Sequence, residues 1–313
     1  MSRLHSIRTH NGSNLMYHIG ALIAVTAWGG SFICTKVLLN NGLSAVEIYL
    51  CRFFLAYIFT LLICPHPFLA RNLRDEFLFL LCGICGGSVY FISENFAVEY
   101  TLVSNVSLIV TLSPLLTTLI IAIMYKTERI GKGVVTGSVI ALCGVACVIF
   151  NSSMSLEVNP LGDMLSLLAA VCWAVYSVVL RPLSSTYSTW FITRKTFFYG
   201  LITALPFLLL DKTHMTLSTL LVPEVAGNLL FLGLFASLIA YLMWGGAVKH
   251  LGAIKTGNYL YFSPIVTLIL SAWLLSEKVS IVGYIGCALI LAGVVASEKI
   301  GKSSRTNSDA TPH

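Results

Sequence analysis

Apolar runs of about 20 residues recur along the whole chain, and they decide what it can fold into. A run of that length is what an α-helix needs to cross the hydrocarbon core of a bilayer. The 313 residues are 57% hydrophobic and only 10% charged, whereas a soluble domain carries about 25% charged residues. The short alternation of apolar and polar residues that marks a transmembrane β-barrel does not recur. The sequence therefore predicts an all-α integral membrane protein.

Ten segments are expected to form transmembrane helices: 17–39, 44–64, 77–98, 102–125, 131–150, 161–181, 189–210, 225–248, 253–275 and 279–298. The first has no small-residue cleavage site and leads directly to Lys36, so it is expected to be a span and not a signal peptide. Residues 1–16 and 300–313 are predicted to be cytoplasmic tails. Two repeats are predicted, 17–150 and 161–299, joined by an outer linker at 151–160.

Lysine and arginine residues between the helices set the orientation, because cytoplasmic loops carry an excess of both. With the N-terminus in the cytoplasm, the outer segments hold only Lys36, Lys212 and Lys278. The cytoplasmic segments then hold 13 such residues: Arg3, Arg8, Arg71, Arg74, Lys126, Arg129, Lys132, Arg181, Lys249, Lys255, Lys299, Lys302 and Arg305. This split predicts a multi-pass protein of the cell membrane with both termini in the cytoplasm.

The two halves of the chain resemble each other at a nearly constant spacing. The pairs Ala97-Val98 and Ser113-Pro114 recur 150 residues later, at 247–248 and 263–264. In the first helix of each half, Trp28 matches Trp173 at a spacing of 145. We therefore expect two copies of a five-helix unit.

Because five is an odd number, the second unit must enter the membrane from the opposite side. The loop charges agree with this inversion. The loop with Glu99 is predicted to be outside and its counterpart with Lys249 inside, while the basic loop 126–132 is inside and its counterpart Glu277-Lys278 outside. Inverted repeats are the architecture of alternating-access transporters, with the binding site near the midplane where the halves meet.

Several stretches resemble the EamA branch of the drug/metabolite transporter superfamily. They are WGGSF (28–32), CRFFLA (51–56), AVEYTLVSNVSLIVTLSPLLTTLI (97–120), its counterpart at 247–277 and GCALILAGVV (286–295). The resemblance spans about residues 17–298. It implies ten helices in inverted repeats, a cavity lined mainly by helices 1, 3, 4, 6, 8 and 9, and transport of amino acids or other small metabolites, often outward. Many EamA sequences carry a small or apolar residue where this chain has Glu94, so that position departs from the family pattern.

Glu94 lies deep in the third predicted helix, where an unpaired charge costs at least about 2.5–3.5 kcal/mol. Its helical face carries Tyr90, Gly87 and Gly83, a groove-like face of small residues with one aromatic. A carboxyl group there can gain and lose a proton during a transport cycle, which makes Glu94 the candidate for proton coupling. The alternative is a neutral or paired glutamate that only holds the bundle together. Its counterpart in the second half is Trp244, and this asymmetry favours a site.

The other candidates are polar or aromatic residues well inside the predicted helices. Trp28, Trp173 and Trp244 are predicted to converge on one central space, as walls for an apolar or aromatic substrate. Pro114 and Pro264 lack a backbone N–H and are predicted to kink helices 4 and 9. Hydroxyl and amide groups have the alternative role of bonding between helices. The predicted substrate-binding set is Trp28, Ser31, Tyr90, Glu94, Asn95, Asn105, Ser107, Thr111, Trp173, Tyr176, Trp244, Asn258 and Tyr259.

The remaining charges inside the helices are expected to be structural. Glu47 and Arg52 are predicted to form a structural or snorkelling pair near the outer end of helix 2. Arg194 and Lys195 are expected to be ordinary charges at the cytoplasmic start of helix 7. Cys82 and Cys85 form a CxxC, but within an apolar helix they are expected to pack as small hydrophobic residues and not to bind a metal.

No catalytic or nucleotide-binding motif is visible. The sequence lacks HExxH, GxSxG and GxxxxGK[ST], and its histidines lie at ends and loops. The predicted function is therefore secondary-active export of small metabolites or amino acids, by a monomer or homodimer in the lipid bilayer, without enzyme activity, cofactor or nucleic-acid partner. An importer or uncoupled exchanger of the same fold is the nearest alternative. A membrane scaffold or receptor is the alternative outside transport.

Overall fold

The computed structural model describes residues 2–124, 160–211, 215–277 and 280–289, with some residues of 136–147 and 291–296. Seven helical segments in the described ranges are long and apolar enough to cross a membrane: Leu15–Asn40, Ala45–Ile63, Leu73–Tyr100, Val103–Met124, Pro160–Thr186, Pro223–Leu251 and Ala253–Leu274. The predicted helix at 131–150 and the linker at 151–160 lie largely outside the described residues. The last predicted helix is helical at 281–289 and 291–293.

The first half contains α1 (Ser2–Asn40), α2 (Ala45–Ile63), a third span of α3 (Leu73–Gly83), η1 (Ile84–Ser88) and α4 (Val89–Tyr100), and a fourth span of α5 (Val103–Val110) and α6 (Ser113–Met124). Helix α1 begins at Ser2, so the predicted tail at 1–16 largely continues this helix.

The second half repeats this order. It contains α8 (Pro160–Thr186), α9 (Thr189–Leu210), the short α10 (Leu217–Leu220), a span of α11 (Pro223–Leu230), η2 (Phe231–Ile239) and α12 (Ala240–Leu251), and a span of α13 (Ala253–Gly257), η3 (Asn258–Phe262) and α14 (Ser263–Leu274).

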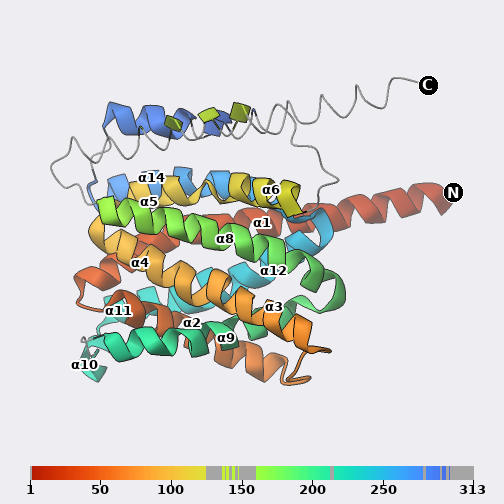
Figure 1. Ribbon diagram of the computed structural model, residues 1–313, viewed down its shortest axis with the longest axis horizontal. Helices are drawn as coiled ribbons and strands as arrows, with labels where there is room; N and C mark the ends of the chain where they lie inside the picture. Colours follow the sequence, from red (N-terminus) through yellow and green to blue (C-terminus); the bar gives the residue numbers. More distant parts are fainter. Residues whose placement is uncertain are drawn as a thin grey trace.

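The first helix of each half packs against the third span of the other half. Helix α1 packs against α12, and its counterpart α8 packs against α4. Helix α1 also contacts α14, as α8 contacts α5 and α6. In Figure 1, α1 and α8 run in opposite directions through the bundle. Helix α6 ends at the end of the bundle where α1 enters, and α8 begins at the opposite end.

Irregular backbone recurs at matching positions. The third span of each half contains a π-helical segment, η1 in the first and η2 in the second, and 150 residues separate Ile84–Ser88 from the middle of η2. Helical pairing is also interrupted just before each Ser-Pro pair, at Thr111–Leu112 in the first half and through the 3₁₀ segment η3 in the second. Both predicted kink residues, Pro114 and Pro264, stand in the first turn of the helix that follows.

Capping residues explain where α2 and α9 begin. The Ser44 hydroxyl accepts a hydrogen bond from Glu47 N at 3.1 Å, and the Glu47 carboxylate accepts one from Ser44 N at 2.9 Å. This capping box satisfies N–H groups that a helix start leaves free. Ser188 caps α9 by the hydroxyl alone, which accepts a hydrogen bond from Phe191 N at 3.2 Å. The two caps are 144 residues apart, so they also align α2 with α9.

Three predictions about charged and small residues were wrong. Glu47 and Arg52 do not pair: the Glu47 carboxylate accepts from Ser44 N and Met215 N, and Arg52 is fully buried and bonds Ser237. Arg194 and Lys195 are buried too, because the loop after α2 folds over them and supplies bonding partners. The face of Gly83 and Gly87 is not an open groove, since a Cβ on Gly83 would meet Tyr199 Cβ at 2.4 Å.

Candidate functional site

A narrow cavity lies where the two halves meet. Its volume, measured as the space open to the centre of a water molecule, is about 30 Å³. That is room for about two waters, far below the roughly 300–1,000 Å³ of a ligand pocket. The lining comes from α1, α4 and α8 and from the fourth span of each half. It consists of Trp28, Ser31, Phe32, Tyr90, Phe91, Glu94, Ser107, Val110, Thr111, Ser113, Trp173, Leu260 and Ser263. The site is thus built from both repeats and is contracted in this structure.

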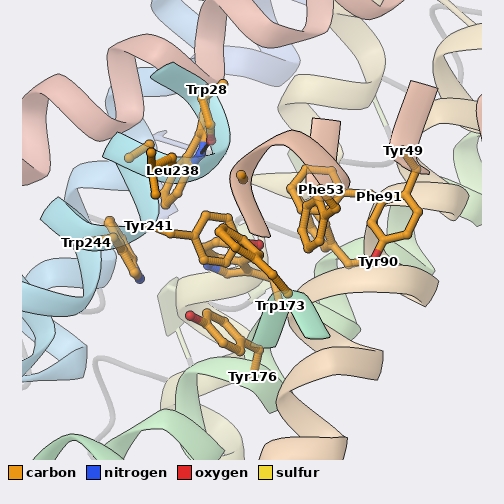
Figure 2. Close-up of a cluster of buried hydrophobic side chains, with 14 of the residues drawn as sticks. Trp28, Tyr49, Phe53, Tyr90, Phe91, Trp173, Tyr176, Leu238, Tyr241 and Trp244 are labelled. Atoms are coloured by element: carbon orange, nitrogen blue, oxygen red, sulfur yellow. Dashed lines mark hydrogen bonds between the residues drawn. The ribbon is translucent and has the colours of Figure 1, made fainter. Parts of the chain in front are cut away.

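The three predicted tryptophans converge beside this cavity. The ring centroids of Trp28 and Trp173 are 5.0 Å apart, those of Trp28 and Trp244 are 5.1 Å apart, and those of Trp173 and Trp244 are 6.0 Å apart. Figure 2 shows Tyr241 in the middle of this group, with Trp173 and Tyr176 turned toward it from α8. Edge-to-face and tilted contacts of this kind favour a rigid aromatic wall.

The π-helical segments supply hydrogen-bond acceptors to this wall. Trp28 Nε1 donates to Ala236 O, in η2, at 2.8 Å, and the Tyr241 hydroxyl donates to Gly86 O, in η1. Ala236 and Gly86 are repeat counterparts, 150 residues apart. Trp173, the counterpart of Trp28, does not make the equivalent bond, since Tyr241 occupies Gly86 O and Trp173 Nε1 has no partner among the described residues. A buried N–H without a partner beside a cavity is a donor that a ligand or water can use.

Glu94 faces the cavity from α4. Its side chain is 4% exposed, and Oε1 accepts a hydrogen bond from the Tyr90 hydroxyl, one helical turn back, at 2.7 Å. Arg52, on α2, interacts with this carboxylate electrostatically but lies beyond ion-pair distance. Among the described residues, Oε2 of this carboxyl group has no hydrogen-bond partner, so it is available to a water molecule or a ligand in the cavity.

The structure separates the predicted site residues into two groups. Seven line the cavity: Trp28, Ser31, Tyr90, Glu94, Ser107, Thr111 and Trp173. Of the others, Asn95 donates to Ala45 O at 2.8 Å, which ties α4 to α2. Asn105 is buried in α5, and its Nδ2 has no partner within the described ranges. Tyr176 and Trp244 stand in the aromatic wall. Asn258 and Tyr259 lie in η3, where the Tyr259 hydroxyl bonds His18 Nδ1 at 2.5 Å.

Sequence reasoning missed three residues of this site. Tyr241 and Phe91 are not among the predicted site residues, although both lie in the central cluster. Arg52 was assigned to the outer end of its helix. An arginine in the middle of an apolar span indicates a functional position inside the bundle. The predicted pairing with Glu47 assigned it a structural role instead.

Contacts close the bundle at both ends of the cavity. At one end, an apolar cluster of Phe32, Ile33, Ala97, Val98, Val103 and Val106 lies below a polar vestibule lined by Lys36, Glu99 and Glu277. At the other, Tyr17 stacks on His250 with ring centroids 3.8 Å apart, and His18 bonds Tyr259. These contacts join α1 to α12 and η3.

Comparison with known proteins places this arrangement in a family. The model of the EamA-like transporter family matches residues 15–150 and 160–297, once for each half. The chain is 27% identical over 276 residues to a probable terminal-alkyne amino-acid exporter of Streptantibioticus cattleyicolor, covering 88% of this chain and 90% of that one. It is 25% identical over 289 residues to a probable amino-acid metabolite efflux pump of Escherichia coli, covering 88% and 92%. A solved crystal structure shares the fold, with a TM-score of 0.60 at 17% identity, over 94% of this chain and 99% of the other. The chain therefore belongs to the EamA-like transporter family: it is a multi-pass membrane transporter of small molecules and not an enzyme.

Proposed function

We propose that this protein exports amino acids or related small metabolites across the cell membrane, by alternating access driven by the proton gradient. The observation that carries the proposal is the position of Glu94. It is an ionisable group in a cavity built by both repeats, where a change in protonation can bias one packing of the halves over the other. The relatives named as an amino-acid exporter and an amino-acid metabolite efflux pump support the substrate class and the outward direction.

The proposed cycle requires the cavity to widen. A space of about 30 Å³ does not admit an amino acid, so substrate enters when the contacts at one end open. Opening at the Tyr17–His250 end admits substrate from the cytoplasm, and opening at the vestibule of Lys36 and Glu277 releases it outside. One chain forms the whole cavity, so the proposed transport unit is a monomer.

The proposed orientation rests on the basic loops. The N-terminus, the loop before α3 and the α12–α13 junction gather at one end of the bundle (Figure 1), and this is the end with most lysine and arginine residues in the sequence. We assign it to the cytoplasm.

Efflux from proteoliposomes tests the proposal. Vesicles are loaded with a radiolabelled mixture of amino acids, and retention is measured with and without an imposed pH gradient. The proposal expects loss of specific amino acids that speeds up with the gradient. Retention equal to that of protein-free vesicles, for every amino acid, contradicts it.

A further inference from the structure

Arg52 differs from other buried cations of the described chain because most of its donors are unused. Its side chain is 0% exposed in the middle of α2. Nε donates to Ser237 Oγ at 2.9 Å, but Nη1 and Nη2 have no hydrogen-bond partner in the part of the chain that the structure describes. Arg194, by contrast, donates from both Nη atoms to backbone carbonyls, and Lys195 pairs with Glu76. Buried charges are normally paired and hydrogen-bonded, so the free end of Arg52 points to a partner that is bound for only part of the time.

Arg52 lies behind a ring that lines the central cavity. Its guanidinium carbon is 4.2 Å from the centroid of Phe91, and Phe91 contributes to the cavity wall. The ring precedes Glu94 by three residues on α4, so it lies on the same side of that helix. A cation with free donors and a carboxylate therefore flank one aromatic side chain.

Both charges belong to the first half alone. The caps at Ser44 and Ser188 align Arg52 with Thr196, and Glu94 corresponds to Trp244. Arg194 and Lys195 also lie in one repeat only, but their donors are satisfied within the protein. A one-sided charge whose donors are unused favours a role toward a ligand, which meets the two halves asymmetrically.

We infer that Arg52 and Glu94 recognise the two ends of a zwitterion. The guanidinium binds the carboxylate of an amino acid, Glu94 binds its ammonium group, and the rings of Trp28 and Trp173 hold an apolar side chain. This inference rests on the proposed export of amino acids and names how the site recognises them. A guanidinium matches a carboxylate through two parallel N–H···O bonds, and Trp173 Nε1 offers a further donor.

Binding in this mode requires Phe91 to leave the face of the guanidinium. Glu94 then holds either a proton or the substrate ammonium group, and the exchange of one for the other links the proton flux to the amino-acid flux. Without substrate, the Phe91 ring covers Arg52 by a cation–π contact, as observed here.

Three probes of similar shape distinguish the role of Arg52 from that of Glu94. They are L-phenylalanine, 2-phenylethylamine, which lacks the carboxylate, and 3-phenylpropionate, which lacks the amine. Affinities are measured by titration calorimetry on purified protein. The native protein is expected to bind phenylalanine at least tenfold more tightly than either analogue. In Arg52→Gln, phenylalanine is expected to bind no better than phenylethylamine, whose own affinity stays unchanged. In Glu94→Gln, the affinity for phenylalanine is expected to fall to the affinity for phenylpropionate.

Two further variants keep the test decisive if Arg52→Gln folds poorly. Arg52→Lys retains the charge without the planar fork, and is expected to keep part of the preference for phenylalanine. Arg194→Gln, at a buried arginine away from the cavity, is expected to lower thermal stability and leave the preference intact. Equal phenylalanine binding by native protein and Arg52→Gln overturns the zwitterion site, as does a parallel loss of phenylalanine and phenylethylamine. If native protein binds no phenylalanine, this site is rejected, while the efflux screen still decides the proposed function separately.

Discussion

The carboxylate of Glu277 caps the helix that begins at Val103. Its Oε1 accepts the backbone N–H of Val103 at 2.8 Å, and Oε2 accepts that of Ser104 at 3.2 Å. Helix α5 has no capping side chain of its own, so a residue after α14 in the second half satisfies the first turn of a helix in the first half. The bond crosses between the repeats at the vestibule end, above the apolar cluster that closes the cavity.

Loss of this cap is expected to open the vestibule end more often. In Glu277→Ala, a cysteine placed at Ser107, in a background without other cysteines, should react several-fold faster with a membrane-impermeant thiol reagent added from the vestibule side. Hydrogen bonds to a charged group contribute about 1.5–3 kcal/mol, enough to shift a closed state substantially. Glu99→Gln serves as the control, because Glu99 lines the same vestibule without a bond to α5. Equal rates in both variants would show that the cap does not hold this end closed.

The aromatic wall is expected to stabilise the bundle as well as to shape the site. Trp28→Ala removes the bond to Ala236 and three ring contacts, and should cost about 3–5 kcal/mol of unfolding free energy. The apparent melting temperature in detergent measures this. Trp273→Ala, at a side chain that is 77% exposed, should change it little. A Trp28→Ala protein as stable as the Trp273→Ala protein contradicts a packed wall.

Loss of one partner of the Lys195–Glu76 ion pair is expected to lower thermal stability more than loss of both partners. Lys195→Met leaves the partly buried carboxylate of Glu76 without its cation, and the loss of a hydrogen bond to a charged group costs about 1.5–3 kcal/mol. The double variant Lys195→Met/Glu76→Gln should recover much of the thermal stability, since no unpaired charge remains. Thermal unfolding of the three proteins measures the difference. A double variant less stable than Lys195→Met would mean that Glu76 acts mainly through Ala70 and Tyr199.

The orientation makes a separate prediction. Asn41 and Arg71 are exposed, the first directly after α1 and the second just before α3. The end of α1 and the start of α3 lie at opposite ends of the bundle (Figure 1). A cysteine at position 41 should react with an impermeant reagent added to intact cells, and one at position 71 should react only after the membrane is broken, because the basic end is assigned to the cytoplasm. The reverse pattern would invert the assignment of both ends.

Much of the fold could be predicted from sequence because bilayer length and repeat spacing are local properties. The spacings that match Trp28 to Trp173 and Glu94 to Trp244 were enough to predict that the three tryptophans meet. The partners of buried charges could not be predicted in this way. Ser237 reaches Arg52 from another span, and the carbonyls that bond Arg194 come from the loop after α2, so both depend on packing that no single segment encodes.

The central claim is that Glu94 couples transport to protons, and gradient-driven transport in proteoliposomes tests it most directly. Amino-acid flux against a concentration gradient is measured in the native protein and in Glu94→Gln, which keeps a hydrogen-bond acceptor for Tyr90 but carries no exchangeable acidic proton. The account predicts that the variant folds and inserts, and that it still exchanges substrate across the membrane at concentrations high enough to offset its weaker binding, but accumulates none in response to a pH gradient. Accumulation by Glu94→Gln that depends on the pH gradient as in the native protein would contradict it.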